Sequence, residues 1–110
     1  MNELDEQAPL MISSRHREEV VAILARHAPN VEVLAYGSRV TGRAQACSDL
    51  DLTLRDPNDS MRPTGLASAV REAFVESLLP FSVDVCDWAL IPESFRQTIS
   101  ACHIRLQRTA

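Results

Sequence analysis

Residues 31–55 have the sequence VEVLAYGSRVTGRAQACSDLDLTLR, and this stretch decides the fold. Residues 31–36 are rich in β-forming side chains and end at Gly37-Ser38, which predicts a strand that runs into a tight glycine turn. Residues 49–55 alternate strictly, with leucine at even positions and polar groups at odd ones, which predicts a second strand with one solvent-facing side. The polar residues 39–46 between them have room for at most about two helical turns.

Helices are predicted on both sides of this stretch. Apolar residues at helical spacing, ended by Pro29, predict a helix over 14–28. A fourfold apolar spacing predicts a longer helix over 63–79, and a last helix is expected over 92–102. His27 lies on the apolar stripe of the first helix, which favours a packed histidine over a metal ligand.

A third strand completes the expected domain. Alternation returns over 82–88, whereas residues 103–107 fit either the end of the last helix or a short edge strand. The expected order is α-β-(short α)-β-α-β-α. We therefore predict an α/β (α+β) fold with a single domain over residues 13–110, preceded by a flexible leader over residues 1–12.

Three aspartates fall on the polar faces of the predicted strands. Asp49 and Asp51 are two residues apart, so their carboxylates project from one face while the leucines point to the other. Asp84 repeats this arrangement on the third strand, and its rival Asp87 lies on the opposite face. Adjacent like charges cost free energy unless a cation lies between them, and carboxylate oxygens suit magnesium. If the two strands are neighbours, Asp49, Asp51 and Asp84 could hold two metal ions, an arrangement that is used for in-line attack on phosphorus.

The glycine turn offers a way to bind phosphate without lysine. Gly37 lets the backbone approach a ligand closely, and backbone amides with the Ser38 hydroxyl can hold phosphate oxygens. A plain structural role, with Gly37 filling a turn and Ser38 capping a short helix, is compatible with this function. All eleven basic residues are arginine, which excludes a Walker A loop, a Schiff-base enzyme and a protein kinase.

Composition and charge restrict the classes of binding partner and the cellular compartment that we expect. The 110 residues carry a net charge of −4, so no general field attracts nucleic acid. Apolar runs are far shorter than the roughly 20 residues that span a bilayer, and the start of the chain is acidic. Three cysteines without CxxC spacing indicate reduced thiols, and Cys47 has no histidine nearby in sequence to make it a nucleophile. We expect a cytoplasmic protein with no nucleic-acid or membrane partner.

The spacing of the glycine turn and the acids resembles a known family. Gly37-Ser38, ten residues and then Asp49-Leu50-Asp51 is similar to the signature of DNA polymerase beta-like nucleotidyltransferases, and most of the chain looks like their minimal, single-domain (MNT) members. The resemblance implies a small mixed sheet with helices mainly on one face. It also implies transfer of a nucleoside monophosphate from a nucleoside triphosphate, with ATP the expected donor, to a hydroxyl. Tyr36 stands where many members have phenylalanine.

The resemblance also assigns roles to residues. Asp49 and Asp51 would be magnesium ligands, and Asp84 would bind metal or take the acceptor proton. Gly37 and Ser38 would bind the triphosphate, and Arg39 would offset charge that develops on phosphate.

Many family members act as antitoxins to a HEPN-domain ribonuclease, some by adding AMP to one of its tyrosines. A HEPN protein is thus the expected partner and a hydroxyl on it the expected acceptor. Two alternatives stay open at this point. The protein could neutralise its partner by occlusion alone, or it could modify a small molecule.

Overall fold

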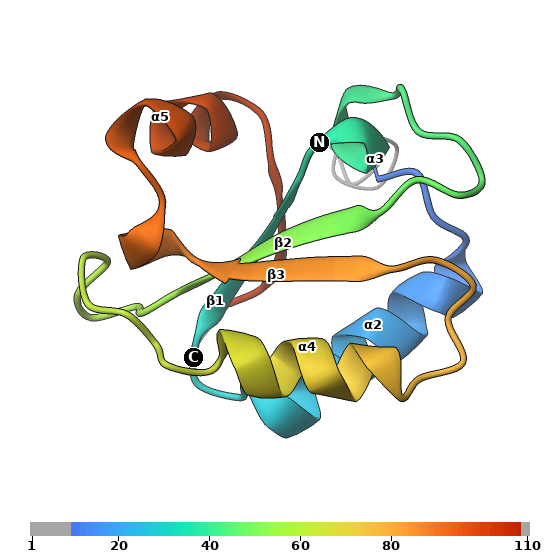
Figure 1. Cartoon of the computed structure of the whole chain (residues 1–110), viewed down its shortest axis with the longest axis horizontal. Helices are drawn as coiled ribbons and strands as arrows, with labels where there is room; N and C mark the ends of the chain where they lie inside the picture. The colour runs from blue at the N-terminus through green and yellow to red at the C-terminus, as the bar shows by residue number, and fades with distance from the viewer. Residues whose placement is uncertain (1–9, 109–110) are drawn as a thin grey trace.

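The computed structural model describes residues 10–108, in which four α-helices, one 3-10 helix and four strands follow one another along the chain (Figure 1). Residues 1–9, most of the predicted leader, lie outside this range. The elements in chain order are α2 (Ser14–His27), β1 (Glu32–Tyr36), α3 (Ser38–Thr41), β2 (Leu50–Arg55), α4 (Ala67–Val75), β3 (Val83–Asp87), η1 (Trp88–Leu90), α5 (Glu93–Ala101) and β4 (Ile104–Gln107).

The four strands form one mixed sheet in the order β3-β2-β1-β4. β1 is antiparallel to both β2 and β4, whereas β2 and β3 are parallel because α4 connects them. The register pairs Tyr36 with Asp51 and Asp51 with Asp84. The end of β1 and the starts of β2 and β3 therefore meet at one end of the sheet. Residues 103–107, left open by the sequence, supply the edge strand β4 rather than a helix end.

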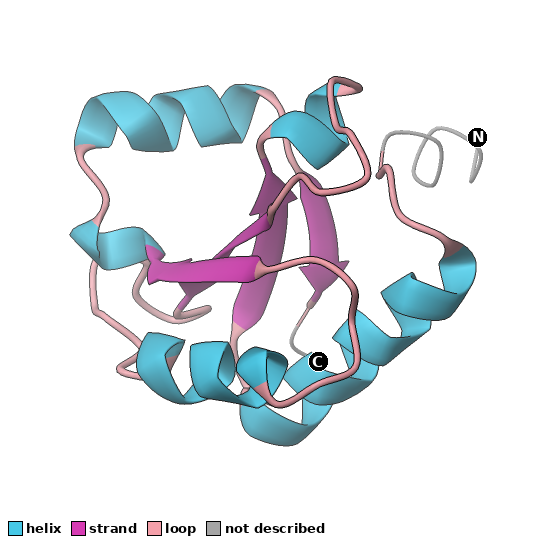
Figure 2. Ribbon diagram, turned by 45° about the vertical axis from the view of Figure 1, so that its right-hand side comes forward, coloured by secondary structure: helices cyan, strands magenta, loops and turns pink. Residues whose placement is uncertain are grey.

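Helices cover both faces of the sheet, as Figure 2 shows. α2 and α4 lie on the face that carries the leucines of β2, and Leu50, Leu52 and Leu54 are completely buried there. Burying one such side chain stabilises the fold by about 1.5–3 kcal/mol. The single-domain fold with a small mixed sheet is confirmed, and α2 and α4 share one face of that sheet.

The second face of the sheet is only partly open to solvent. α5 and η1 close over its middle, where Leu34, Trp88 and Ile99 form a smaller core. Thr53 is completely buried there, and its hydroxyl has no hydrogen-bond partner among the described residues. The predicted fully solvent-facing side of residues 49–55 is therefore wrong at its centre. Only the end that carries the aspartates stays accessible.

The second long helix is shorter than predicted. The expected span of 63–79 contracts to α4, because the buried Asp87 carboxylate accepts hydrogen bonds from the Thr64 amide and hydroxyl and from the Gly65 amide. These bonds hold the chain in a turn before the helix begins. At the other end the helix stops at Val75, and Leu78 is 93% exposed rather than packed.

The predicted leader extends too far into the domain. Leu10 is buried in the main core, and the Met11 amide donates to the Arg39 carbonyl at 2.7 Å. Residues 10–12 are therefore part of the packed structure. His27, expected to pack, is exposed at the end of α2. Within residues 10–108, none of the helices combines the length and the apolar character needed to cross a membrane.

Candidate functional site

A tight approach between the glycine turn and β2 shapes the candidate site. Gly37 has φ 86° and ψ −156°, a conformation that is essentially restricted to glycine. A Cβ atom at this position would lie 2.3 Å from the Asp51 carboxylate oxygen Oδ2. The residue therefore has to be glycine for two independent reasons, and the absent side chain leaves the space in which the Asp51 carboxylate lies.

The three predicted acids lie at the same end of the sheet. Asp51 is half-buried and is the register partner of Asp84, whose side chain is exposed, and the exposed Asp49 directly precedes β2. Burial raises the pKa of Asp51 above its ordinary 3.8, and the negative charges of Asp84 and then Asp49 raise it further. The carboxylates are thus close enough to repel one another, and a cation among them would relieve that repulsion.

The donors fit magnesium in type but do not form a complete cage. Within residues 10–108, no group of three or more His, Cys, Asp or Glu side chains is arranged to hold a metal ion by itself. Magnesium usually binds through one or two carboxylates together with water and substrate phosphates, rather than in a cage made only of protein. Asp49, Asp51 and Asp84 suit that mode of binding, in which water and substrate phosphates complete the coordination.

The two acids of β3 have separate environments. Asp84 faces the site, whereas Asp87 is 5% exposed and is held by the turn before α4. The period of two along a strand predicts this difference, and the structure confirms that the two side chains lie on opposite faces. Asp87 serves the fold, and Asp84 remains the acid available to a ligand.

The turn after β1 presents backbone donors beside the acids. Ser38 begins α3, and the Gly37 carbonyl accepts the Val40 and Thr41 amides at 3.0 Å each. The first amides of any helix lack intrahelical acceptors, so those of Ser38 and Arg39 remain without a partner inside α3. Gly37 and Ser38 therefore lie where an anion beside the carboxylates would meet N–H and O–H groups.

Arg39 is placed differently from the sequence expectation. Its side chain is 6% exposed, and the guanidinium donates to carbonyl oxygens of Met11, Ala46 and Ser48. Its plane also stacks over the Phe81 ring, with the guanidinium carbon 4.4 Å from the ring centre. These contacts could not be predicted from the sequence, because Met11 and Phe81 come from parts of the chain that no motif connects to Arg39.

Tyr36 and Cys86 contact each other beside the acids. The Tyr36 hydroxyl lies 3.5 Å from Cys86 Sγ, and its ring meets Phe95 edge-on at 5.5 Å. Burial raises the pKa of the Tyr36 phenol, and Cys86, Asp51 and Asp84 raise it further, so the phenol stays protonated. The sequence placed Cys86 on the face of Asp84 by its period of two, but it did not indicate the pairing with Tyr36.

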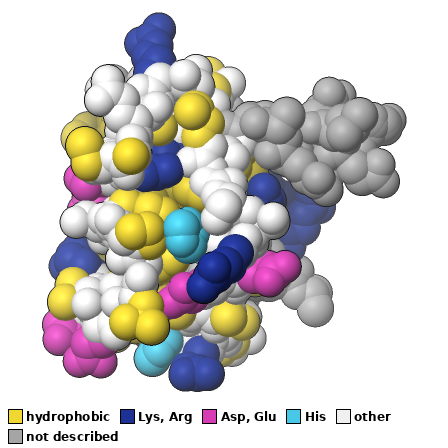
Figure 3. Space-filling model, turned by 90° about the vertical axis from the view of Figure 1, so that its right-hand side faces the viewer, with side chains coloured by type: hydrophobic (Ala, Val, Ile, Leu, Met, Phe, Trp, Pro, Cys, Tyr) yellow, Lys and Arg dark blue, Asp and Glu magenta, His cyan; other side chains and the backbone are white. Residues whose placement is uncertain are grey.

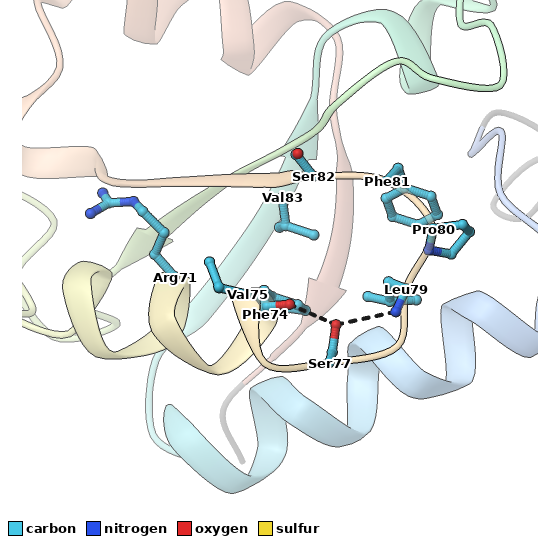
Figure 4. A pocket seen from close by; sticks show the side chains of 9 residues that line it. All are labelled: Arg71, Phe74, Val75, Ser77, Leu79, Pro80, Phe81, Ser82 and Val83. Carbon is cyan, nitrogen blue, oxygen red and sulfur yellow. Dashed lines mark hydrogen bonds between the residues drawn. The ribbon is translucent and has the colours of Figure 1, made fainter.

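One hollow lies beside the start of β3. A cavity of about 450 Å³ is enclosed by the end of α4, the following loop and the start of β3 (Figure 4). Val83 points into it toward Phe74, whereas Ser82 points to the opposite side of the strand. None of Asp49, Asp51 and Asp84 lines this cavity, and Asp49 and Asp84 are exposed. Figure 3 shows the end of the molecule at the right of Figure 1, where arginine, acidic and hydrophobic side chains are interspersed.

Comparison with known proteins identifies the family. The chain is 40% identical over 102 residues to the probable protein adenylyltransferase MntA of Haemophilus influenzae, which covers 91% of this chain and 86% of that protein. The chain belongs to the MNT-type nucleotidyltransferases. The family predicted from Gly37-Ser38 and Asp49-Leu50-Asp51 is thus confirmed, and with it the enzyme class. No protein-family model matches this MNT-type chain.

A solved structure supports the MNT-type fold independently. The chain superimposes on a protein in a crystal structure of a toxin-antitoxin with AMP-PNP, with a TM-score of 0.67 and 17% sequence identity. The match covers 84% of this chain and 73% of that one. At this identity the likeness concerns the fold alone, and it includes most of the described domain.

Proposed function

We propose that this MNT-type nucleotidyltransferase transfers AMP from ATP to a hydroxyl of a partner protein and so acts as an antitoxin. The observation that carries the proposal is the contact between the glycine turn and two neighbouring strands that bear carboxylates: Asp51 lies against Gly37 and is in register with Asp84. The name of the Haemophilus relative and the AMP-PNP in the toxin-antitoxin crystal support ATP as the donor.

Magnesium is the cofactor that suits these donors. Asp49, Asp51 and Asp84 would hold one or two Mg²⁺ ions, which neutralise phosphate charge and orient the phosphoryl group for in-line attack. The raised pKa of Asp51 supports this assignment, since its causes are burial and unbalanced negative charge. Asp84, the most open acid on β3, is also placed to accept the proton of the attacking hydroxyl.

The glycine turn would orient the donor. The backbone at Gly37 and the amide and hydroxyl of Ser38 would bind triphosphate oxygens, because these groups adjoin Asp51 and lack intrahelical acceptors. The phosphates would then lie between N–H donors on one side and carboxylates on the other. This arrangement holds the nucleotide without any lysine, which the chain does not have.

The open surface around the acids favours a macromolecular acceptor. Asp49 and Asp84 are exposed, and neither lines the described cavity beside β3. A small acceptor would have little protein surface around it beside these exposed acids, whereas a partner protein can present a hydroxyl and exclude water with its own surface. We propose a HEPN-type ribonuclease toxin as that partner and a tyrosine as its acceptor. The free thiols of Cys47, Cys86 and Cys102 suit the reducing cytoplasm, where we place the reaction.

Label transfer from ATP tests the proposed reaction. The purified protein is incubated with ATP labelled in the α-phosphate, magnesium and the HEPN protein encoded beside it. We expect label on the HEPN protein, its loss on chelation of magnesium, and its loss in Asp49→Asn. Asp59→Asn is the matched control, since Asp59 is an exposed aspartate in the turn beyond the far end of β2. Label on neither protein, or equal label with Asp49→Asn, would refute the proposal.

Neutralisation by occlusion alone is separated by a cell assay. The double variant Asp49→Asn/Asp51→Asn is expressed with the toxin after its folding and its binding to the toxin have been verified. Loss of protection supports catalysis, whereas full protection shows that binding suffices. Transfer to a panel of small hydroxyl compounds without the HEPN protein would instead identify a small-molecule acceptor.

A further inference from the structure

We propose that Arg39 is a positioning residue, which holds the loop before Asp49 and the segment before Asp84 in place around the glycine turn. The inference rests on the proposed function only for its catalytic consequence. The contacts themselves concern the chain alone. Arg39 lies two residues after Gly37. A side chain that holds the neighbouring segments from this position therefore also fixes where they lie relative to the glycine turn.

The Arg39 guanidinium donates hydrogen bonds to carbonyl oxygens of the loop that leads into β2. Its Nε and Nη2 donate to the Ser48 carbonyl at 3.1 and 2.9 Å, and Nη2 also reaches the carbonyls of Ala46 at 3.2 Å and Gln45 at 3.5 Å. Nη1 donates to the Met11 carbonyl at 2.6 Å. All three nitrogens of the fork are therefore occupied by the protein, and the group is not free to bind phosphate.

The two hydrogen bonds to the Ser48 carbonyl fix the orientation of the Ser48–Asp49 peptide unit. A trans peptide is planar, so a carbonyl aimed at Arg39 turns the N–H of the next residue in the opposite direction. The orientation of the Ser48–Asp49 peptide is thereby set, and with it the direction in which the Asp49 side chain leaves the backbone. Asp49 is exposed and lies outside β2, so the sheet alone does not impose this direction.

The same guanidinium also supports the segment that leads into β3. It stacks on the ring of Phe81, three residues before Asp84, at 4.4 Å from the ring centre. A planar cation over an aromatic face is attracted to it and stabilises both groups. The Met11 amide closes the arrangement from the other side by donating to the Arg39 backbone carbonyl. One side chain thus touches the segments before Asp49 and before Asp84.

Arginine is required here because of its shape rather than its charge. A lysine ammonium is a compact point charge, and it cannot reach carbonyls on three sides while it also lies flat on a ring. Arg39→Lys should therefore keep the charge but release part of the loop. Arg39→Met keeps the apolar stem and should release all of it. Arg43→Met is the matched control, since Arg43 is an exposed arginine in the same loop.

Hydrogen exchange of the protein without ligands tests the proposal directly. The amides of Gln45 and Ser48 are hydrogen-bonded within the loop, to the Ser48 hydroxyl at 2.8 Å and the Gln45 carbonyl at 3.0 Å, so their exchange reports its order. We expect exchange there to rise on the order of tenfold or more in Arg39→Met, less in Arg39→Lys, and not at all in Arg43→Met. Amides in the middle of α2 should be unaffected in all three.

The kinetic test separates positioning from direct contact with phosphate. Misplacing reactive groups by about 1 Å can cost on the order of a hundredfold in rate, so kcat should fall by about that factor in Arg39→Met, with a smaller change in KM for ATP. Unchanged loop exchange together with weakened ATP binding would overturn the proposal in favour of direct phosphate contact. Faster exchange throughout the chain would overturn it in favour of general stability.

Failure of the two proposals can be told apart. If the wild-type protein transfers no nucleotide, the proposed function fails, while the exchange of the Gln45 and Ser48 amides still decides whether Arg39 holds the loop. If Arg39→Met does not fold, Arg39→Lys gives the same decision. Normal loop exchange in a folded Arg39→Lys with wild-type kcat would refute a requirement for the arginine fork.

Discussion

Gly37→Ala should damage the fold and the site through two separate effects. Alanine at φ 86° and ψ −156° lies in a region that costs about 1–3 kcal/mol for a residue with a side chain. Its Cβ would also lie 2.3 Å from Asp51 Oδ2, so the Asp51 side chain would have to leave its preferred rotamer at about 0.5–1.5 kcal/mol. We therefore expect a loss of about 1.5–4.5 kcal/mol in the free energy of unfolding.

Gly42→Ala is the control for a glycine that has positive φ but no close neighbour. Gly42 has the same φ of 86° in the left-handed helical region, and a Cβ there would meet nothing within 4 Å. Gly42→Ala should lower the free energy of unfolding by about 1 kcal/mol and leave nucleotidyl transfer intact. Urea unfolding measures both losses, and the transfer assay is run under conditions in which each variant is folded.

A double-mutant cycle isolates the contact between Gly37 and Asp51. In the Asp51→Ala background the oxygen at 2.3 Å is absent and only Asp51 Cβ remains, at an ordinary 3.5 Å. Gly37→Ala should then cost less than in the wild type by about 0.5–1.5 kcal/mol, the part due to the collision. Equal costs in the two backgrounds, or a Gly37→Ala variant as stable and active as Gly42→Ala, would refute the close approach on which the site is built.

Three further predictions concern acids and a buried hydroxyl. Asp87→Ala should lower the free energy of unfolding by about 2–4 kcal/mol, because it leaves the Thr64 amide and hydroxyl without their acceptor. Asp84→Ala should change the free energy of unfolding by less than about 0.5 kcal/mol but abolish transfer. Urea unfolding and the label assay together distinguish the two variants. Thr53→Val should stabilise by about 1 kcal/mol by removing an unpartnered buried hydroxyl, and a lower urea midpoint would show that the hydroxyl is bonded. The pKa of Asp51 is raised on folding, so the folded state holds its proton more tightly and stability falls as pH rises from 3.8 through the raised pKa. Asp51→Asn should therefore have the higher melting temperature at neutral pH, with the difference shrinking to zero in acid, and a variant less stable at neutral pH would contradict this sign.

Local periodicity was sufficient to predict the parts of the site that lie on strands. The alternation of residues 49–55 placed Asp51 opposite the buried leucines, and the alternation of residues 82–88 distinguished Asp84 from Asp87. A strand has only two faces, so one strong apolar face determines where every other side chain points. That β2 and β3 are neighbours could only be stated as a condition, because sequence does not contain strand order.

Contacts between distant segments could not be predicted. The buried state of Thr53 depends on α5 and η1 closing over the sheet, and the short α4 depends on Asp87 reaching back to Thr64. The resemblance to the nucleotidyltransferase family assigned Arg39 to phosphate charge. The structure instead surrounds it with carbonyls from Met11 and the loop before Asp49. Charge pattern indicates that a cation needs partners, but it does not show which groups supply them.

The costs of this fold are concentrated around the proposed site. Gly37 has a strained backbone, the Asp51 carboxylate is half-buried among like charges, and Arg39 is a buried cation that bonds to carbonyls rather than to a carboxylate. A sequence selected for stability alone would avoid each of these features, and the leucine face of β2 offsets them by burial. Their coincidence within residues 37–51 is best explained by a ligand that benefits from all three. The proposed magnesium-bound triphosphate has the required chemistry: its cation would balance the acids, its oxygens would accept from the open turn, and a fixed loop would keep Asp49 in reach.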